Sequence, residues 1–416
     1  MDFDTICREL HLSEKLVAEI SPFRDELMAY ADEKLPFFME RDFYKKYFPW
    51  CSSFENRRIY PAMDEVAAIS AANPAVCCYA SMMYYAYFCA DRKLLSIPWE
   101  ELTDVFGENA GIFNLMLAMS SLKLIRQKHI ELGLDEEFTR RQAQWIGGLI
   151  PSYAAGRNGK AGFILRSMYW LRNAVDGQLF RIGRLEFLER PASGEMPLIL
   201  RRKSDGKLAV LCRNWSFNKY NFRVSDDTDD VEFRTELEYF DGMVRGTPVN
   251  AYGFPVREKS VSCDLGQWEK ICDTKDACMT VHIPGGGGMT MDKFRESLCD
   301  AKKFFLEKFN KKIRIFTCES WILNPAWEKE LPNSNFAALQ RNVYMTPCPV
   351  PSGTPGTYFV YGEVECDPRE RECITSLHRA FCRVLERGEP LRNGNMFILP
   401  EDVEKFGSNY YRNLSE

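Results

Sequence analysis

Apolar residues recur every three or four positions through the first 150 residues of the chain. Residues 14–32 show the pattern clearly, with one face formed by Leu16, Ile20, Phe23, Leu27 and Tyr30. This spacing is typical of an amphipathic helix, and few strand-like runs interrupt it. The pattern therefore predicts an all-helical region, with helices over residues 14–32, 58–70, 74–90, 99–106 and 109–132.

One apolar stretch, residues 66–90, carries no charged residue and is longer than the roughly 20 residues that a membrane-spanning helix needs. However, Asn73 and Pro74 interrupt it, and its tyrosines lie within the stretch rather than at both ends. We therefore predict a buried helix with Pro74 in its first turn, and no membrane partner.

The pattern changes near residue 151. A helix is predicted over residues 163–175, and residues 179–187 then alternate like one half-buried strand. The turn sequence Ser204-Asp205-Gly206 separates two further strand candidates, as in a hairpin. Strands are predicted at residues 197–202, 207–213, 278–283, 312–317, 357–361 and 396–399, and helices at 291–309 and 373–386. We therefore expect an α+β protein with a helical domain over residues 1–150 and a mixed-sheet domain over 151–416, which closes with a strand, a helix and a strand.

Composition narrows the class of protein further. The chain has 416 residues, 45% of them apolar, which is enough for substantial cores. Its net charge is −5 and the 54 basic residues form no concentrated patch, so we expect no nucleic-acid partner. Fifteen cysteines include no CxxC pair, so we expect no metal site and mostly core thiols. No apolar leader begins the chain, so we expect a cytoplasmic protein.

The segment Val281-His282-Ile283-Pro284-Gly285-Gly286-Gly287-Gly288 carries the clearest chemistry. A histidine ends an apolar strand, four glycines follow, and a long amphipathic helix opens near Thr290. Glycine lets backbone N–H groups approach a ligand, and the helix N-terminus carries about half a positive charge. This order predicts an anion cradle for the pyrophosphate of a cofactor.

Two familiar phosphate motifs do not fit this segment. No Gly-Lys-Ser/Thr follows the glycines, and the third glycine of the dinucleotide fingerprint is replaced by Thr290. What remains is a pyrophosphate site built from backbone alone, as in acyl-coenzyme A enzymes of the GNAT type, which needs no metal. The alternative is a flexible glycine loop that merely joins a strand to a helix.

Several nearby side chains are candidates for catalysis. His282, one of four histidines, can take a proton from an attacking amine, or can simply hydrogen-bond across the sheet. Glu319 follows the next predicted strand and can bind or deprotonate an amine, or form a salt bridge. Cys318 is a core thiol or, less simply, an acylated nucleophile paired with His282. Arg181 and Arg184 are expected on one exposed strand face, where contact with a phosphate or carboxylate is the alternative.

Three segments give the chain a resemblance to a family of two-domain bacterial proteins, in which a helical N-acyltransferase N-terminal domain precedes a GNAT-like C-terminal domain. They are Phe180-Arg181-Ile182-Gly183-Arg184-Leu185-Glu186-Phe187, Val281-His282-Ile283-Pro284-Gly285, and Phe316-Thr317-Cys318-Glu319-Ser320-Trp321-Ile322-Leu323-Asn324-Pro325. The run Leu331-Pro332-Asn333-Ser334-Asn335 continues the pattern. Two positions depart from it, because four glycines follow Pro284 and Glu319 stands where histidine is more usual.

The resemblance implies an acyl-CoA-dependent N-acyltransferase. Acetyl-CoA or a longer acyl-CoA is the expected co-substrate, and a small-molecule or peptide amine is the expected acceptor. Gly285 to Gly288 and Thr290 would hold the pyrophosphate, Val281 and Ile283 would lie beside the thioester, and His282 or Glu319 would accept the amine proton. The alternative is a catalytically silent binding or scaffold protein that keeps the fold.

Overall fold

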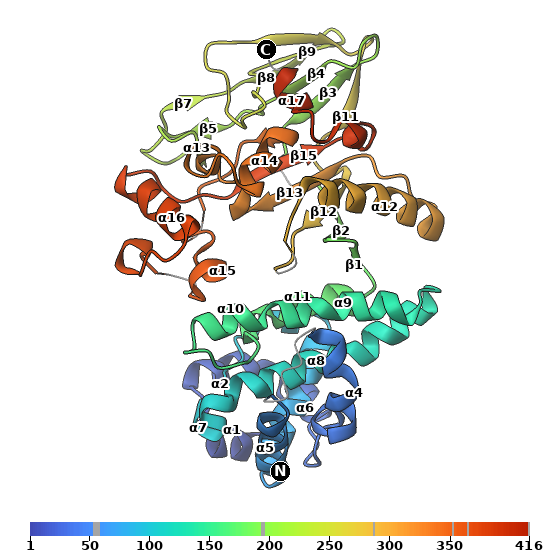
Figure 1. The fold of residues 1–416 in the computed structure, drawn as a ribbon, viewed down its shortest axis with the longest axis vertical. Coiled ribbons are helices and arrows are strands. Elements are labelled where there is room, and N and C mark those ends of the chain that lie inside the picture. Colours follow the sequence, from blue (N-terminus) through green and yellow to red (C-terminus); the bar gives the residue numbers. More distant parts are fainter. Residues whose placement is uncertain (53–58, 193–195, 286–287, 352, 364–365, 415–416) are drawn as a thin grey trace. The chain divides into compact units, whose positions relative to one another are not determined.

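The computed structural model describes residues 1–52, 59–192, 196–285, 288–351, 353–363 and 366–414. These residues form two compact units (Figure 1). The helical unit comprises Met1–Arg181 together with Pro284–Gly286, and the sheet unit comprises Ile182–Ile283 and Gly287–Glu416. A helical N-terminal region followed by a mixed-sheet region confirms the predicted α+β class.

The helical unit contains α1 (Phe3–Glu9), α2 (Glu14–Ile20), η1 (Ser21–Phe23), α3 (Arg24–Met28), η2 (Phe37–Met39), α4 (Arg41–Cys51), α5 (Ile59–Ala71), α6 (Pro74–Phe88), η3 (Arg92–Ser96), α7 (Thr103–Phe106), η4 (Gly107–Asn109), α8 (Ala110–Glu131), α9 (Glu136–Gly148), α10 (Ile150–Ala155), η5 (Leu165–Ser167) and α11 (Met168–Val175). The segment predicted as one helix over 14–32 is broken, because Pro22 lies in the short 3₁₀ turn Ser21–Phe23. The helix predicted over 99–106 is limited to α7.

Helix α8 is the centre of the helical unit. Every residue from Ala110 to Leu122 is buried, which is typical of a helix surrounded by other helices. The side-chain NH₂ group of the buried Asn114 donates to Glu101 Oε1 at 3.2 Å and to the carbonyl of Phe163 at 3.3 Å, whereas its Oδ1 has no hydrogen-bond partner among the described residues. α8 therefore provides the core against which the other helices pack.

Helix α6 begins as predicted. Asn73 caps it by accepting from the amides of Ala75 and Val76, and Pro74 is its first residue. Eleven of its fifteen residues are buried. No single helix among the described residues is long and apolar enough to cross a membrane; α5 and α6, bent by 109°, pass that test of length and composition only as a pair.

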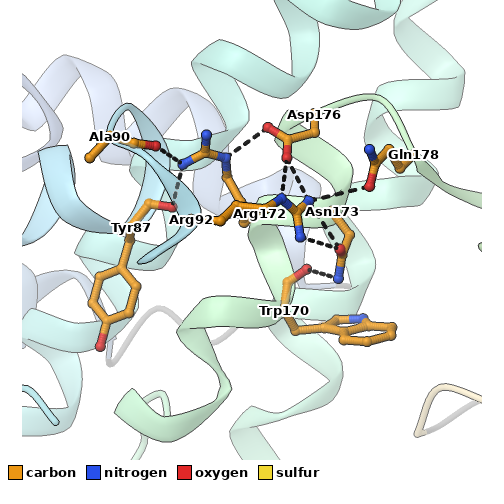
Figure 2. A network of polar contacts seen from close by, with 8 residues as sticks. All are labelled: Tyr87, Ala90, Arg92, Trp170, Arg172, Asn173, Asp176 and Gln178. Carbon is orange, nitrogen blue, oxygen red and sulfur yellow. Dashed lines mark hydrogen bonds and ion pairs between the residues drawn. The ribbon is translucent and has the colours of Figure 1, made fainter. Parts of the chain in front are cut away.

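A polar network ties the end of α6 to α11 (Figure 2). Asp176 accepts from Arg172 Nε at 2.7 Å and from Arg92 Nε at 3.0 Å. Arg172 Nη1 also donates to the carbonyl of Ala90 at 2.8 Å, which satisfies a carbonyl beyond the end of α6. The two arginines share one carboxylate, so the network fixes α11 against the segment that follows α6.

The main sheet has six strands in the order β1-β2-β12-β13-β15-β14, and all of them except β1 lie wholly in the sheet unit. Among the described registers of this sheet, β12 and β13 form the one parallel pair, and the β2–β12, β13–β15 and β14–β15 pairs are antiparallel. The strands are β1 (Leu179–Ile182), β2 (Leu185–Pro191), β12 (Ala277–His282), β13 (Phe316–Ser320), β14 (Tyr344–Thr346) and β15 (Gly394–Ile398).

Three small sheets lie between β2 and β12 in the sequence, in the orders β11-β3-β4, β10-β9-β8 and β6-β5-β7. Their strands are β3 (Leu198–Arg202), β4 (Leu208–Leu211), β5 (Ser216–Phe217), β6 (Arg223–Val224), β7 (Phe233–Arg234), β8 (Leu237–Phe240), β9 (Met243–Gly246), β10 (Val261–Asp264) and β11 (Trp268–Cys272). The predicted hairpin at 204–206 is confirmed, since β3 and β4 pair across it.

The remaining helices of the sheet unit are α12 (Met291–Phe309), η6 (Trp321–Leu323), α13 (Ala326–Glu330), α14 (Asn335–Asn342), α15 (Thr357–Tyr361), η7 (Pro368–Glu370), α16 (Ser376–Glu386), η8 (Pro400–Lys405) and α17 (Tyr410–Asn413). The predicted bounds of α12 are confirmed. Its apolar face buries Phe294, Leu298, Ala301 and Phe305 as expected.

Three sequence predictions in this unit are wrong. Residues 357–361 form α15 rather than a strand, because glycines with positive φ bound the run and its side chains pack against the cluster around Phe381. Residues 179–187 form two strands, β1 and β2, joined at Gly183 and Arg184. The strand predicted at 312–317 is β13, which begins at Phe316 and continues through Glu319.

Candidate functional site

The parallel pair β12 and β13 separates early. Its ladder joins Met279 to Phe316 and Thr280 to Thr317. β12 continues to His282 and β13 continues to Ser320, but within the described chain each then pairs only with its outer neighbour, β2 or β15. We call this point, beyond Thr280 and Thr317, the fork. Main-chain donors and acceptors on the inner sides of the fork have no strand partner.

His282 and Glu319 lie on the same face of the sheet, one on each side of the fork. Paired residues of a parallel ladder point to one face, and every second residue returns to that face. Since Thr280 pairs with Thr317, the side chains of His282 and Glu319 project to the side of these two threonines. The structure therefore places the two predicted catalytic residues on one face of the sheet, at the same end of two neighbouring inner strands.

Hydrogen bonds to Thr280 fix the tautomer of His282. The Thr280 hydroxyl donates its one hydrogen to the carbonyl of Leu188 at 2.6 Å. Its oxygen lies 3.1 Å from His282 Nε2 and must therefore accept from that nitrogen. In the neutral ring the proton is then on Nε2, and the basic lone pair is on Nδ1.

His282 is neutral at physiological pH. Burial, together with the positive charge of Arg190, lowers the pKa of His282 to about 4. Glu186 is the residue directly opposite His282 in the β2–β12 ladder and is fully buried. The Cβ atoms of directly opposed residues in such a ladder lie about 5 Å apart. The ring is thus a base that is already deprotonated.

Glu319 is exposed, and it lies within β13 rather than beyond the end of the strand, where the sequence had predicted it. Its Oε1 accepts from the side-chain amide of Asn393 at 3.0 Å. Asn395 is its partner in the β13–β15 ladder and shares its face. The buried Oδ1 of Asn395 has no hydrogen-bond partner among the described residues. Asn393 and Asn395 therefore add amide groups to the face that carries His282.

Cys318 projects to the opposite face of the sheet. There it lies with Phe187, Val281 and Phe316, which are all buried. Burial raises the pKa of the Cys318 thiol to about 12. A protonated thiol on the other side of the sheet cannot pair with His282, so the core interpretation of Cys318 is the one that the geometry supports.

The glycine run is described at its two ends. Gly285 belongs to the helical unit and Gly288 to the sheet unit, whereas Gly286 and Gly287 lie outside the described residues. Gly288 has φ +61°, a conformation that favours glycine. Val281 is buried and Ile283 half-buried beside the run.

Thr290 is the N-cap of α12, and its hydroxyl accepts from the amide of Lys293 at 3.3 Å. The carbonyl of Thr290 accepts from Phe294, so the cap satisfies the third and fourth amides of the helix. The amides of Met291 and Asp292 are left for solvent or a ligand. Asp292 itself is exposed, with its carboxylate 3.8 Å from Arg295, and its charge opposes a second anion at this end.

The turn between β1 and β2 anchors the end of the glycine run. Arg184 Nε donates to the carbonyl of Gly288 at 2.8 Å, and the backbone amide of Arg184 donates to Ser297 Oγ at 2.8 Å. Gly183 in the same turn has φ +59°, and a Cβ there would lie 2.5 Å from Ser297 Oγ. Arg181 and Arg184 therefore do not share a strand face, because Arg184 is a turn residue with a structural contact.

No group of three or more His, Cys, Asp or Glu side chains within the described ranges is arranged to hold a metal ion. Ten of the fifteen cysteines are buried.

The sequence from 179 to 397 matches the family described as GNAT-like C-terminal domain. This match spans more than half of the chain. The chain belongs to this family. A comparison with curated proteins finds no match.

Solved acyltransferases share the fold of this GNAT-like chain over nearly its whole length. One, in complex with decanoyl-CoA and teicoplanin, is 19% identical with a TM-score of 0.60. A mutant acyltransferase in complex with octanoyl-CoA is 18% identical with a TM-score of 0.62. A third, in complex with CoA and 10C-teicoplanin, is 19% identical with a TM-score of 0.62. Each comparison covers 96% of this chain and 99% of the other.

Several residues of the GNAT-like site were not found from the sequence. The pairing of β2 with β12 places Thr280 and Glu186 beside His282's strand position, and the two strands are nearly 100 positions apart in the sequence. Asn393 and Asn395 reach the site only because β15 pairs with β13. A signal existed for Thr280 alone, since residues two apart on a strand share a face.

Gly183→Ala should destabilise the sheet unit by about 2–3 kcal/mol. The added Cβ would clash with Ser297, and the alanine backbone would have to adopt the positive φ of Gly183. Gly206→Ala is the matched control: its φ is +76° and nothing lies within 4 Å of the added Cβ, so about 1 kcal/mol is expected. Urea unfolding measures both. Equal losses in the two variants would contradict the contact between the turn and α12.

Proposed function

We infer that the protein is an acyl-CoA-dependent N-acyltransferase that joins an acyl group to an amine by direct attack. The observation that carries this proposal is the fork, because it opens main-chain amides beside a neutral histidine and just before a glycine run and a helix N-terminus. The acyl-CoA and CoA complexes of the similar acyltransferases support the choice of co-substrate.

The pyrophosphate would bind the backbone amides of Gly285 to Gly288 and the start of α12. The Thr290 cap bonds the third and fourth amides of α12, which leaves the first two without a partner among the described residues, and Arg184 Nε donates to the carbonyl of Gly288. The pantetheine arm is a chain of amides, and it would take the main-chain hydrogen bonds that β12 and β13 no longer make to each other. The thioester would then lie beside Val281 and Ile283, next to His282.

In the reaction the amine nitrogen attacks the thioester carbonyl, a C–N bond forms and the C–S bond breaks. His282 Nδ1 accepts the proton that the amine loses. Because the pKa of His282 is lowered, its imidazolium is a stronger acid than usual and passes the proton to the departing thiolate. Glu319, Asn393 and Asn395 lie across the fork and would hydrogen-bond the acceptor, with Glu319 as the less favoured base because it is exposed.

The ligands of the similar solved acyltransferases suggest a class of acceptor. The similar acyltransferases are bound to teicoplanin or 10C-teicoplanin in two of the solved complexes. We infer a small-molecule or peptide amine as the acceptor of this chain, and teicoplanin is a suitable first probe.

The direct test is release of free thiol from acetyl-, octanoyl- and decanoyl-CoA with a panel of amines. We expect amine-dependent thiol release with at least one donor. Thermal shift with the same donors measures binding separately, and a ligand at about 100 times its Kd adds roughly 2.7 kcal/mol of stability. Stabilisation without thiol release for any amine would favour a silent binding protein. The absence of both stabilisation and thiol release would contradict the acyltransferase proposal.

His282→Ala should lower kcat by roughly 10²–10⁴-fold while leaving the Kd for CoA nearly unchanged. Thr280→Val should lower kcat roughly 10-fold or more, since the tautomer of His282 is no longer fixed, and Thr280→Ser should restore it. Thr228→Val, at an exposed loop position, is the control. An unchanged rate in the alanine variant would remove His282 from the mechanism.

Asp292→Asn should tighten CoA binding roughly 2- to 5-fold at low salt, because it removes a negative charge from the first turn of α12. The gain should shrink as ionic strength rises. Asp300→Asn, about 12 Å further along the same helix, is the control and should have little effect. Calorimetric titration with CoA measures both; weaker binding by Asp292→Asn would place the pyrophosphate elsewhere.

A further inference from the structure

A cavity with a volume of about 310 Å³ lies in the sheet unit. Its apolar wall is formed by Tyr252, Phe254, Pro325 and Met345. We propose that this cavity is a binding site for a small organic carboxylate with an aromatic or aliphatic body. The proposal is independent of the acyl-transfer function.

The buried guanidinium of Arg412 provides the anion-binding group. Arg412 is 9% exposed. Its Nη2 donates to Glu328 Oε2 at 2.9 Å and to the carbonyl of Gln340 at 3.1 Å. Its Nε and Nη1 are buried and have no hydrogen-bond partner within the part of the chain that the structure describes. Buried donors without an acceptor are costly, and Arg412 is one of the residues that line the cavity.

The charges at the cavity favour a single negative charge on the ligand. Arg412 and Lys329 are positive, and Glu328 is the one carboxylate in the lining. The lining therefore has a net charge of +1. A dianion such as phosphate would leave an excess negative charge against an apolar wall, whereas a monocarboxylate neutralises the site and places its hydrocarbon part on that wall.

The aromatic wall is preformed. Asn250 Oδ1 accepts from the amides of Tyr252 and Phe254, at 3.0 and 3.1 Å, and so fixes the loop between them. Gly253 has φ +86°, and a Cβ there would lie 3.0 Å from the Cβ of Met345. The Tyr252 ring centroid lies 3.7 Å from Arg412 Cζ, so the ring covers one face of the guanidinium and leaves its edge to hydrogen bonds.

This cavity is separate from the fork. Met345 pairs with Met396, which pairs with Cys318, so Met345 projects from the face opposite to His282. β14 is also three strands from β12 in the sheet, about 14 Å at the usual spacing. A small ligand on Arg412 therefore binds at a place distinct from His282.

The test uses the full chain with benzoate, phenylacetate and hexanoate as probes, followed by calorimetry and thermal shift. Benzamide is the neutral counterpart of benzoate, and inorganic phosphate is the alternative anion. We expect saturable binding of at least one carboxylate with a rise in Tm, and no comparable binding of benzamide or phosphate. Failure of all three carboxylates to bind, or equal binding of benzamide or phosphate, would overturn the proposal.

Variants locate the binding. Arg412→Met should weaken carboxylate binding roughly 10- to 100-fold, because the charged donors are lost. Arg369→Gln, at an exposed arginine, is the control. Glu328→Gln raises the net charge of the lining and should tighten binding several-fold, so it tests the site even where Arg412→Met fails to fold. Unchanged affinity in both Arg412→Met and Glu328→Gln would also overturn the proposal.

Discussion

The short parallel ladder between β12 and β13 is the constraint on which the site depends. Two residue pairs, Met279–Phe316 and Thr280–Thr317, join the strands before each turns to its outer neighbour. The rest of the sheet is antiparallel in its described registers and holds both strands from outside. The fork thus opens inside a sheet without creating a free edge, and the polar groups of two strand ends remain available for a ligand.

Local sequence was sufficient where the signal is local. The bounds of α12, the hairpin at residues 204–206 and the first turn of α6 all follow from periodicity and caps. The strand predicted at residues 357–361 was wrong because tertiary packing overrode β propensity in a five-residue run between glycines. The short strands of residues 214–264 carry two to four residues each, too few to show a period.

The sequence predicted only those parts of the site that are close together along the chain. His282 and the glycine run are adjacent in sequence, so their order indicated an anion cradle. Glu186, Asn393 and Asn395 are brought to His282 by register, and no pattern within one segment specifies which strand pairs with which. The role of Arg184 was missed for a related reason, since a two-residue turn at Gly183 interrupts an alternation that otherwise reads as one strand.

The proposed acyl-transfer site and the cavity at Arg412 lie on opposite faces of the sheet, and β15 pairs with a strand from each site. Asn395 pairs with Glu319 on one side and with Thr346 on the other, so the face at the fork continues to the edge strand β14. On the opposite face, Met345 is next to Thr346 and lines the cavity at Arg412. A shift of β14 caused by a ligand at Arg412 would therefore move Thr346 and, through the ladder, Asn395. The β13–β15–β14 ladder is therefore the direct backbone connection between the two sites, while the buried core around Phe316 and Cys318 fills the face of the sheet opposite to His282.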